Sequence, residues 1–162
     1  MDGIHKKIQK NALVVGMGLL VVAAFMVLAA FASAWSLLAG GAPLDFSEGR
    51  VLDTLVRTMT YALLTALIMY AARIFFRIST QETPFFKELP RKIKTAAVML
   101  FFALAIPRWI GYALHSFAIG SIAGAVVDEV LLAALVMSGL LFCLGQVFEY
   151  GYLLQDESYD IL

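Results

Sequence analysis

The chain has 162 residues, of which 62% are hydrophobic and only 15% are charged, with a mean hydropathy of +0.87. A soluble domain of this length has too little interior to bury so much apolar surface, so the composition excludes one and makes a lipid bilayer the expected solvent. Twelve basic residues balance twelve acidic ones, which gives no overall signature of nucleic-acid binding. We therefore expect one all-α integral membrane domain over residues 1–162.

The first apolar run, 12–39, contains no charged residue and follows Lys6, Lys7 and Lys10. Its start resembles a secretory signal peptide, and Ala32 and Ala34 even supply a small-x-small pattern. The apolar region of a signal peptide, however, is only about 7–15 residues long. Because this run is longer and further apolar runs follow it, we expect a retained transmembrane helix.

The second expected span, 54–76, surrounds a charge-free run between Arg57 and Arg73. The 16 residues from one arginine to the other correspond to about 24 Å of helix, and the long arginine side chains can reach the remaining distance to water. Both arginines are therefore expected at opposite membrane interfaces.

The third expected span, 95–119, is interrupted by Pro107, Arg108 and His115, whereas the fourth, 130–148, is uninterrupted. A helix that ended before Pro107 would be too short to cross the bilayer. We therefore expect a kinked third span with Arg108 in its outer part.

Basic residues are distributed unevenly between the two sides of these four spans. Nine of the twelve lie in the N-terminal segment or between Arg73 and Lys94, and only Arg50, Arg57 and Arg108 fall on the other side. The positive-inside rule then predicts that the N and C termini and the central loop are cytoplasmic.

The central loop contains the stretch QETPFFKELPRKIK, residues 81–94. Thr83 and Pro84 are typical of a helix start, and Pro90 is expected to bend the segment before the third span. Its apolar and basic residues fall on different helical faces, which predicts an amphipathic segment on the inner leaflet. The basic residues expected at that lipid interface are Lys87, Arg91, Lys92 and Lys94.

No sequence motif for catalysis or metal binding is present: there is no HExxH, Gly-rich phosphate loop or CxxC. The single cysteine, Cys143, has no metal-ligand spacing around it and is expected to be a small core residue. We therefore expect no enzyme activity, no metal and no cofactor. The glycines and small residues of the first and fourth spans (Gly16, Gly18, Ala134, Ser138 and Gly139) predict close helix packing.

An outer polar cluster is the strongest concentration of charge near the spans, and it comprises Asp53, Arg57, Arg108, Asp128 and Glu129. Ionisable residues within a membrane are functional candidates by default. Two interpretations remain open here. In the favoured one, Arg108 pairs with Asp128 or Glu129 and ties the third span to the fourth. In the other, the cluster is an ion or substrate site open to the outside.

The C-terminal segment, 149–162, is acidic and is expected in the cytoplasm. Gly151 is expected to end or loosen the fourth helix. Beyond it, Leu153 and Leu154 are apolar, whereas Asp156, Glu157 and Asp160 are acidic. An anionic leaflet repels such a tail, and a basic surface attracts it.

Two short stretches resemble a bacterial membrane-protein family known as domain of unknown function 2975. Pro84 and Phe85 match its turn before the third span. Its C-terminal motif is matched by Phe148, Gly151, Leu154, Gln155 and Glu157. The chain departs from the family pattern at Pro90 and over the last five residues, 158–162.

The resemblance implies a compact multi-pass protein of the bacterial inner membrane that captures a helix-turn-helix transcription regulator, with these seven matched residues as its contacts. The chain itself would not bind nucleic acid, and its partners would be the bilayer and that regulator. A small transporter or lipid-handling protein that uses the outer polar cluster is the main alternative. An accessory subunit of a membrane complex and a homo-oligomer also stay open.

Overall fold

The computed structural model describes residues 2–39, 49–80, 88–120 and 127–160, and the side chains of 6–39, 49–80, 88–120 and 127–154. Four α-helices account for nearly all of these residues: α1 (Asp2–Ala39), α2 (Gly49–Thr80), α3 (Leu89–Ile119) and α4 (Glu129–Asp160). Each is long and apolar enough to cross a membrane, which confirms the predicted all-α chain with four candidate spans.

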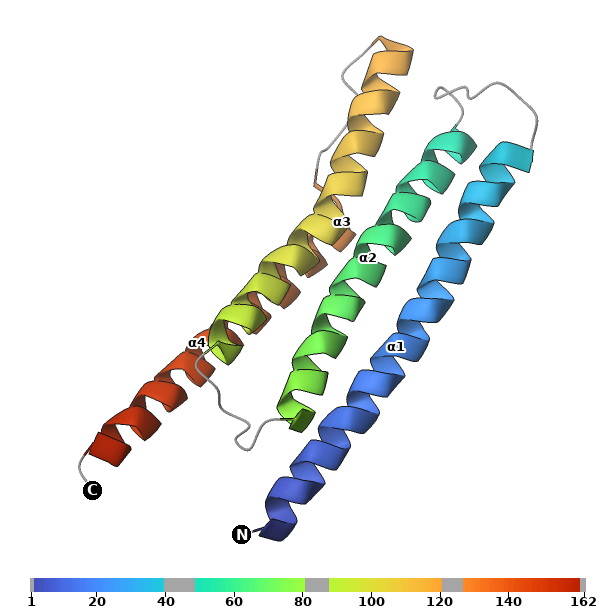
Figure 1. Cartoon of the computed structure of the whole chain (residues 1–162). Helices are drawn as coiled ribbons and strands as arrows, with labels where there is room; N and C mark the ends of the chain where they lie inside the picture. The colour runs from blue at the N-terminus through green and yellow to red at the C-terminus, as the bar shows by residue number, and fades with distance from the viewer. Residues whose placement is uncertain (1, 40–48, 81–87, 121–126, 161–162) are drawn as a thin grey trace.

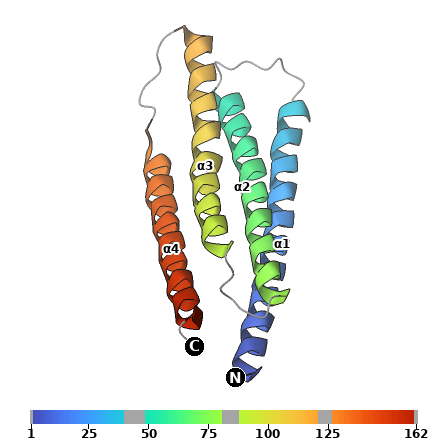
Figure 2. The same cartoon turned by 60° about the vertical axis from the view of Figure 1, so that its left-hand side comes forward.

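The helices pack only against their neighbours in the sequence. Among the described residues, α1 contacts α2, α2 contacts α3 and α3 contacts α4, but α1 does not contact α4. The four helices therefore form an open row rather than a closed four-helix bundle (Figures 1 and 2). The first turn of α1 and the last turn of α4 lie at the same end of this row (Figure 1).

Small side chains fill the contacts between helices, and large ones point outward. The buried apolar residues are mostly alanines, including Ala23, Ala72 and Ala105. Phe25, Phe31 and Leu38 are among the exposed large residues, each with more than 60% of its surface accessible. This arrangement suits a hydrocarbon solvent, in which close backbone approach rather than burial of large apolar side chains holds helices together.

The backbone of α4 approaches α3 closely at Gly145. A Cβ at this position would lie 2.8 Å from Lys94 Cγ and 3.3 Å from the Pro90 carbonyl oxygen. Of the residues predicted to pack closely, Ala134 and Ser138 are buried on α4, and Gly16 faces the Phe76 ring. For Gly18 and Gly139 the prediction was wrong, because a Cβ at either would meet nothing within 4 Å.

The third apolar run forms one continuous helix, α3, and Pro107 lies fully buried inside it. Because the described helix continues on both sides of Pro107, Arg108 is part of α3 rather than of a following loop. The segment that Pro90 was expected to bend lies largely outside the described residues. Pro90 itself occupies the first turn of α3, where its missing N–H leaves no intrahelical bond unmade, and Thr83 and Pro84 lie outside the described residues.

Two expectations for α4 were wrong. Gly151 does not end the helix, which continues to Asp160, so residues 149–160 are a helical extension rather than an irregular tail. Helix propagation through one glycine costs only about 1 kcal/mol relative to alanine, and the following residues are ordinary helix formers. Cys143 is exposed on α4 and is not a core residue, because the side of α4 that packs on α3 carries Ala134, Ser138 and Gly145.

We predict that Gly145→Ala destabilises the protein and that Gly139→Ala does not. Overpacking against backbone atoms of α3 should lower the free energy of unfolding by about 1–3 kcal/mol. Gly139 lies on the same helix with open space around it, so its replacement should leave stability unchanged or slightly higher. Thermal unfolding in detergent measures both variants, and equal melting temperatures would contradict the assigned contact between α3 and α4.

Candidate functional site

Arg108 and Asp128 form the centre of the outer polar cluster. Arg108 Nε donates a hydrogen bond of 2.6 Å to Asp128 Oδ2, with 22% and 32% of the two side chains exposed. The structure thus joins α3 to the start of α4 through Asp128, and not through Glu129, which lies exposed at the first residue of α4.

Asp128 also caps α4. Its other carboxylate oxygen, Oδ1, accepts a 2.8 Å hydrogen bond from the backbone N–H of Leu131, and its carbonyl oxygen accepts one from Leu132. An aspartate directly before a helix that begins with an acidic residue is a typical N-cap signal, so the sequence alone already indicated this role for Asp128. One carboxylate therefore both starts α4 and fixes α4 to α3.

The Asp128 carboxyl has a pKa below its ordinary value of 3.8. Partial burial acts to raise the pKa, but the hydrogen bonds from Arg108 and from the Leu131 amide outweigh that effect. Because the folded state lowers this pKa, the stabilisation is complete above the unfolded value and is lost as the pH falls through the lowered one. The ion pair is therefore intact at neutral pH.

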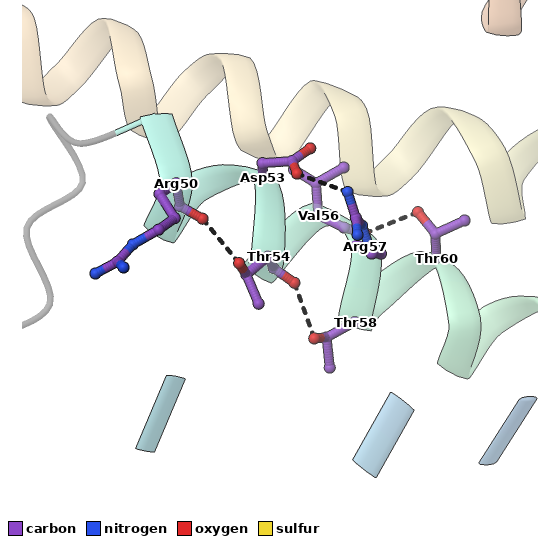
Figure 3. Close-up of polar contacts among 7 residues, drawn as sticks. All are labelled: Arg50, Asp53, Thr54, Val56, Arg57, Thr58 and Thr60. Carbon is purple, nitrogen blue, oxygen red and sulfur yellow. Dashed lines mark hydrogen bonds and ion pairs between the residues drawn. The ribbon is translucent and has the colours of Figure 1, made fainter. Parts of the chain in front are cut away.

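Asp53 and Arg57 pair with each other on α2. Arg57 Nη2 donates a 2.9 Å hydrogen bond to Asp53 Oδ2 within the same helical face (Figure 3). Both side chains are more than half exposed, so this i,i+4 pair contributes only a few tenths of a kcal/mol. Nearby threonine hydroxyls donate to carbonyls one turn earlier, as Thr54 does to Arg50 and Thr58 to Thr54 (Figure 3). Such bonds satisfy polar groups at low cost in an apolar helix.

A cavity of about 250 Å³ lies between these two ion pairs. Asp53, Arg108 and Asp128 line it together with Val56, Gly111 and other residues of α2 and α3. Arg57 and Glu129 are not among its lining residues, so the structure brings three of the five predicted residues to one cavity. Each of the three already has a partner of opposite charge, which leaves the cavity without an unpaired charge from these residues.

At the opposite end of the row, basic residues of α3 pair with acidic neighbours. Lys92 and Arg77 both pair with Glu88, whose pKa is lowered by the hydrogen bond from Lys92 and by the nearby charge of Arg77. Lys94 Nζ pairs with Glu149 on α4. Arg91 is exposed, whereas Lys87 lies outside the described residues.

The residues matched to the family motifs are only partly described. Phe148 is half-buried, and Gly151 and Leu154 are exposed on α4. Gln155 and Glu157 lie within α4, but their side chains are outside the described part, as are Pro84 and Phe85 entirely.

No family model, no curated protein and no solved structure matches this chain. The resemblance to the family known as domain of unknown function 2975 therefore stays a prediction.

We predict that Arg108→Ala lowers the free energy of unfolding by about 1–3 kcal/mol, because it leaves the Asp128 carboxylate partly buried without its charged partner. Asp128→Asn keeps a capping oxygen but removes the charge, whereas Asp128→Ala should cost about 1 kcal/mol more through loss of the cap. Arg50→Ala, on an exposed arginine of α2, is the control.

Thermal unfolding of Arg108→Ala, Asp128→Asn and the double variant measures the coupling between the two side chains. We expect the double variant to be less destabilised than the sum of the single variants, by about 1 kcal/mol or more. Additive effects would show that the two side chains do not stabilise the fold as a pair.

Proposed function

We propose that this protein is a non-enzymatic, multi-pass protein of the bacterial inner membrane that captures a basic cytoplasmic partner on the C-terminal extension of α4. The observation that carries the proposal is the continuation of α4 as a helix to Asp160, beyond the ion pair of Glu149 with Lys94.

The length of α4 divides it into a spanning part and an extension. From Glu129 to Glu149 the helix rises about 30 Å, the thickness of the hydrocarbon core. Both of these positions carry acidic side chains, which are inexpensive at the interfaces and costly between them. The remaining 11 residues, 150–160, correspond to about 16 Å of helix, which this proposal assigns to the space outside the hydrocarbon.

The start of this extension exposes apolar side chains. Tyr150, Leu153 and Leu154 are 65%, 52% and 50% exposed. Val147, Tyr150 and Leu154 follow one another at the i, i+3, i+7 spacing of a helix that docks into a groove. Three acidic residues, Asp156, Glu157 and Asp160, follow in the sequence. An apolar stripe followed by acidic residues suits a partner whose surface combines an apolar groove with basic residues.

A helix-turn-helix transcription regulator has such a basic surface, because it binds phosphate groups of DNA. The family resemblance is what favours a regulator over other basic proteins, and it is an argument by analogy. Capture at the membrane would withhold the regulator from DNA without any contact between this chain and nucleic acid.

The alternative, a small transporter or lipid-handling protein that uses the outer polar cluster, draws support from the cavity beside Arg108. We favour partner capture because the charges that line this cavity are already paired. An Arg108→Ala variant with unchanged stability and a lost transport activity would reverse this preference.

The proposal requires that both chain ends face the cytoplasm. Reporter fusions after Lys94 and after Leu162 should read cytoplasmic, and a fusion after Gly49 should read external. Nine basic residues in the N-terminal segment and the central loop set the orientation, and the side of the C terminus follows from four spans. An external reading for the fusion after Leu162 would place α4's extension on the wrong side for this partner.

We predict that deletion of Gly151–Leu162 leaves membrane insertion and the four spans intact but abolishes partner binding. Replacing Asp156, Glu157 and Asp160 by the corresponding amides should weaken binding more at low salt than at high salt, because salt already screens part of the attraction. Leu154→Ala should weaken binding at every salt concentration, because apolar burial is not screened.

Affinity capture from gently solubilised membranes, with the partner identified and its binding measured, tests this prediction. Val136→Ala is the matched control for Leu154→Ala, since Val136 is 61% exposed on the spanning part of the same helix. A truncated protein that retains the partners of the full chain would overturn the proposal.

A further inference from the structure

An apolar groove opens between α1 and α4 at the end of the row that carries both chain termini. Residues of all four helices line it, among them Val15 of α1, Phe75 of α2, Ile93 of α3 and Phe148 of α4. Its volume is about 580 Å³, and Asn11 is the one polar residue in its lining. The groove exists because α1 and α4 do not contact each other, so that α2 and α3 form its floor.

The groove lies near the ends of the helices, and we infer that its open end is at a membrane interface. On α1 the lining extends from Ile8 to Val15, which is about 10 Å of helix, and it begins among the N-terminal lysines. On α3 it extends from Leu89 to Ala96, a stretch that also contains Arg91, Lys92 and Lys94. Both helices therefore carry the lining from a basic, water-accessible end into the hydrocarbon.

A lysine stands at the α1 rim of the groove. Lys7 precedes Asn11 by four residues, so the two side chains lie on the same face of α1, with Lys7 one turn closer to the open end. Lys7 is exposed, and none of the ion pairs between described residues includes it, in contrast to Lys92 and Lys94. An exposed cation thus lies beside the mouth of an apolar groove.

We propose that this groove binds one acyl chain of an anionic phospholipid of the cytoplasmic leaflet, with the Lys7 ammonium group contacting its phosphate. The charge at the rim and the apolar lining match the two parts of such a lipid.

The bound lipid would supply contacts that α1 and α4 do not make with each other. A ligand that binds only the folded protein stabilises it by mass action, so added lipid should raise the melting temperature in detergent. This inference goes beyond partner capture, because it concerns the membrane part of α1 and α4, and either proposal can fail without the other.

The test uses the full-length protein in detergent with two probes that share palmitoyl and oleoyl chains, phosphatidylglycerol and phosphatidylcholine. Native mass spectrometry should detect one retained phosphatidylglycerol, preferred over phosphatidylcholine by about fivefold, the effect expected for one lysine near an anionic lipid. Lys7→Gln should remove that preference. Lys6→Gln should not, because Lys6 is also exposed but lies on the side of α1 that faces away from the groove lining.

Filling the groove tests the acyl-chain site separately. Val15→Trp should reduce retention of both lipids about tenfold, whereas Val14→Trp, at an exposed residue outside the groove, should leave it unchanged. Ala71→Leu fills the groove from α2 and serves if Val15→Trp does not fold.

Three results would overturn the proposal. Equal losses in Val14→Trp and Val15→Trp would show that the groove is not the site. Equal retention of the two lipids by the unaltered protein would exclude recognition of an anionic head group. A dimer that is disrupted by Val15→Trp would assign the groove to a second copy of the chain.

Discussion

Close approach of helix backbones through small side chains is the constraint on which this structure depends. At Gly145 the α4 backbone lies so near α3 that even a methyl group would meet a carbonyl oxygen of Pro90 and the Lys94 side chain. Gly111 has the same role between α3 and α2, since a Cβ there would lie 2.5 Å from Val56 Cγ2. Lipid tails are as apolar as leucine, so large side chains gain little from burial between helices, and dispersion contacts between closely packed backbones provide most of the attraction. The exposed phenylalanines and leucines follow from the same constraint.

The same packing explains why the row stays open. A helix that buries a stripe of small residues against one neighbour presents larger side chains on its remaining faces. On α4 the buried stripe, Leu131, Ala134 and Ser138, faces α3, whereas Leu132, Val136 and Leu140 are exposed. On α1 the corresponding residues, Ala12, Gly16 and Ala23, are buried where that helix contacts α2. The outer helices α1 and α4 do not contact each other, and a groove is left between their ends at the proposed cytoplasmic side.

Hydropathy alone predicted the number of helices and their approximate positions. A charge inside hydrocarbon costs so much free energy that charged residues in the sequence mark where each apolar run stops. It predicted less well where the helices end. Each helix is longer than its apolar run: α1 begins before Lys6, and α4 continues beyond Gly151. A helix needs its backbone hydrogen bonds to be satisfied, and turns exposed to water satisfy them as well as buried turns do. The helix can therefore continue beyond the limits of the apolar run.

The sequence predicted the type of interaction in the outer polar cluster but not its geometry. Arg108 within a span required an acidic partner, and two adjacent candidates were available. The choice of Asp128 follows from its position just before α4, where one carboxylate oxygen accepts the Leu131 amide and the other remains directed to Arg108. Asp53 and Arg57 were predicted as members of the same cluster, but their i,i+4 spacing on one helix allows them to pair locally. To choose between these pairings, one must know which face of its helix each residue lies on and which residue caps the helix.

The two ion pairs of α4 also separate the part of the helix that is fixed to α3 from its C-terminal extension. Asp128 fixes the start of α4 to α3 through Arg108, and Glu149 fixes it again through Lys94, about 30 Å further along. Between these two points the helix faces lipid and α3, where a change in sequence affects packing. Beyond Glu149 it has passed the first turn of α3, as the red end of α4 in Figure 1 shows, and α3 no longer covers it. Tyr150, Leu153 and Leu154 are exposed there, and acidic residues follow them in the sequence. The partner proposed above would cover these apolar side chains and pair with the acidic ones.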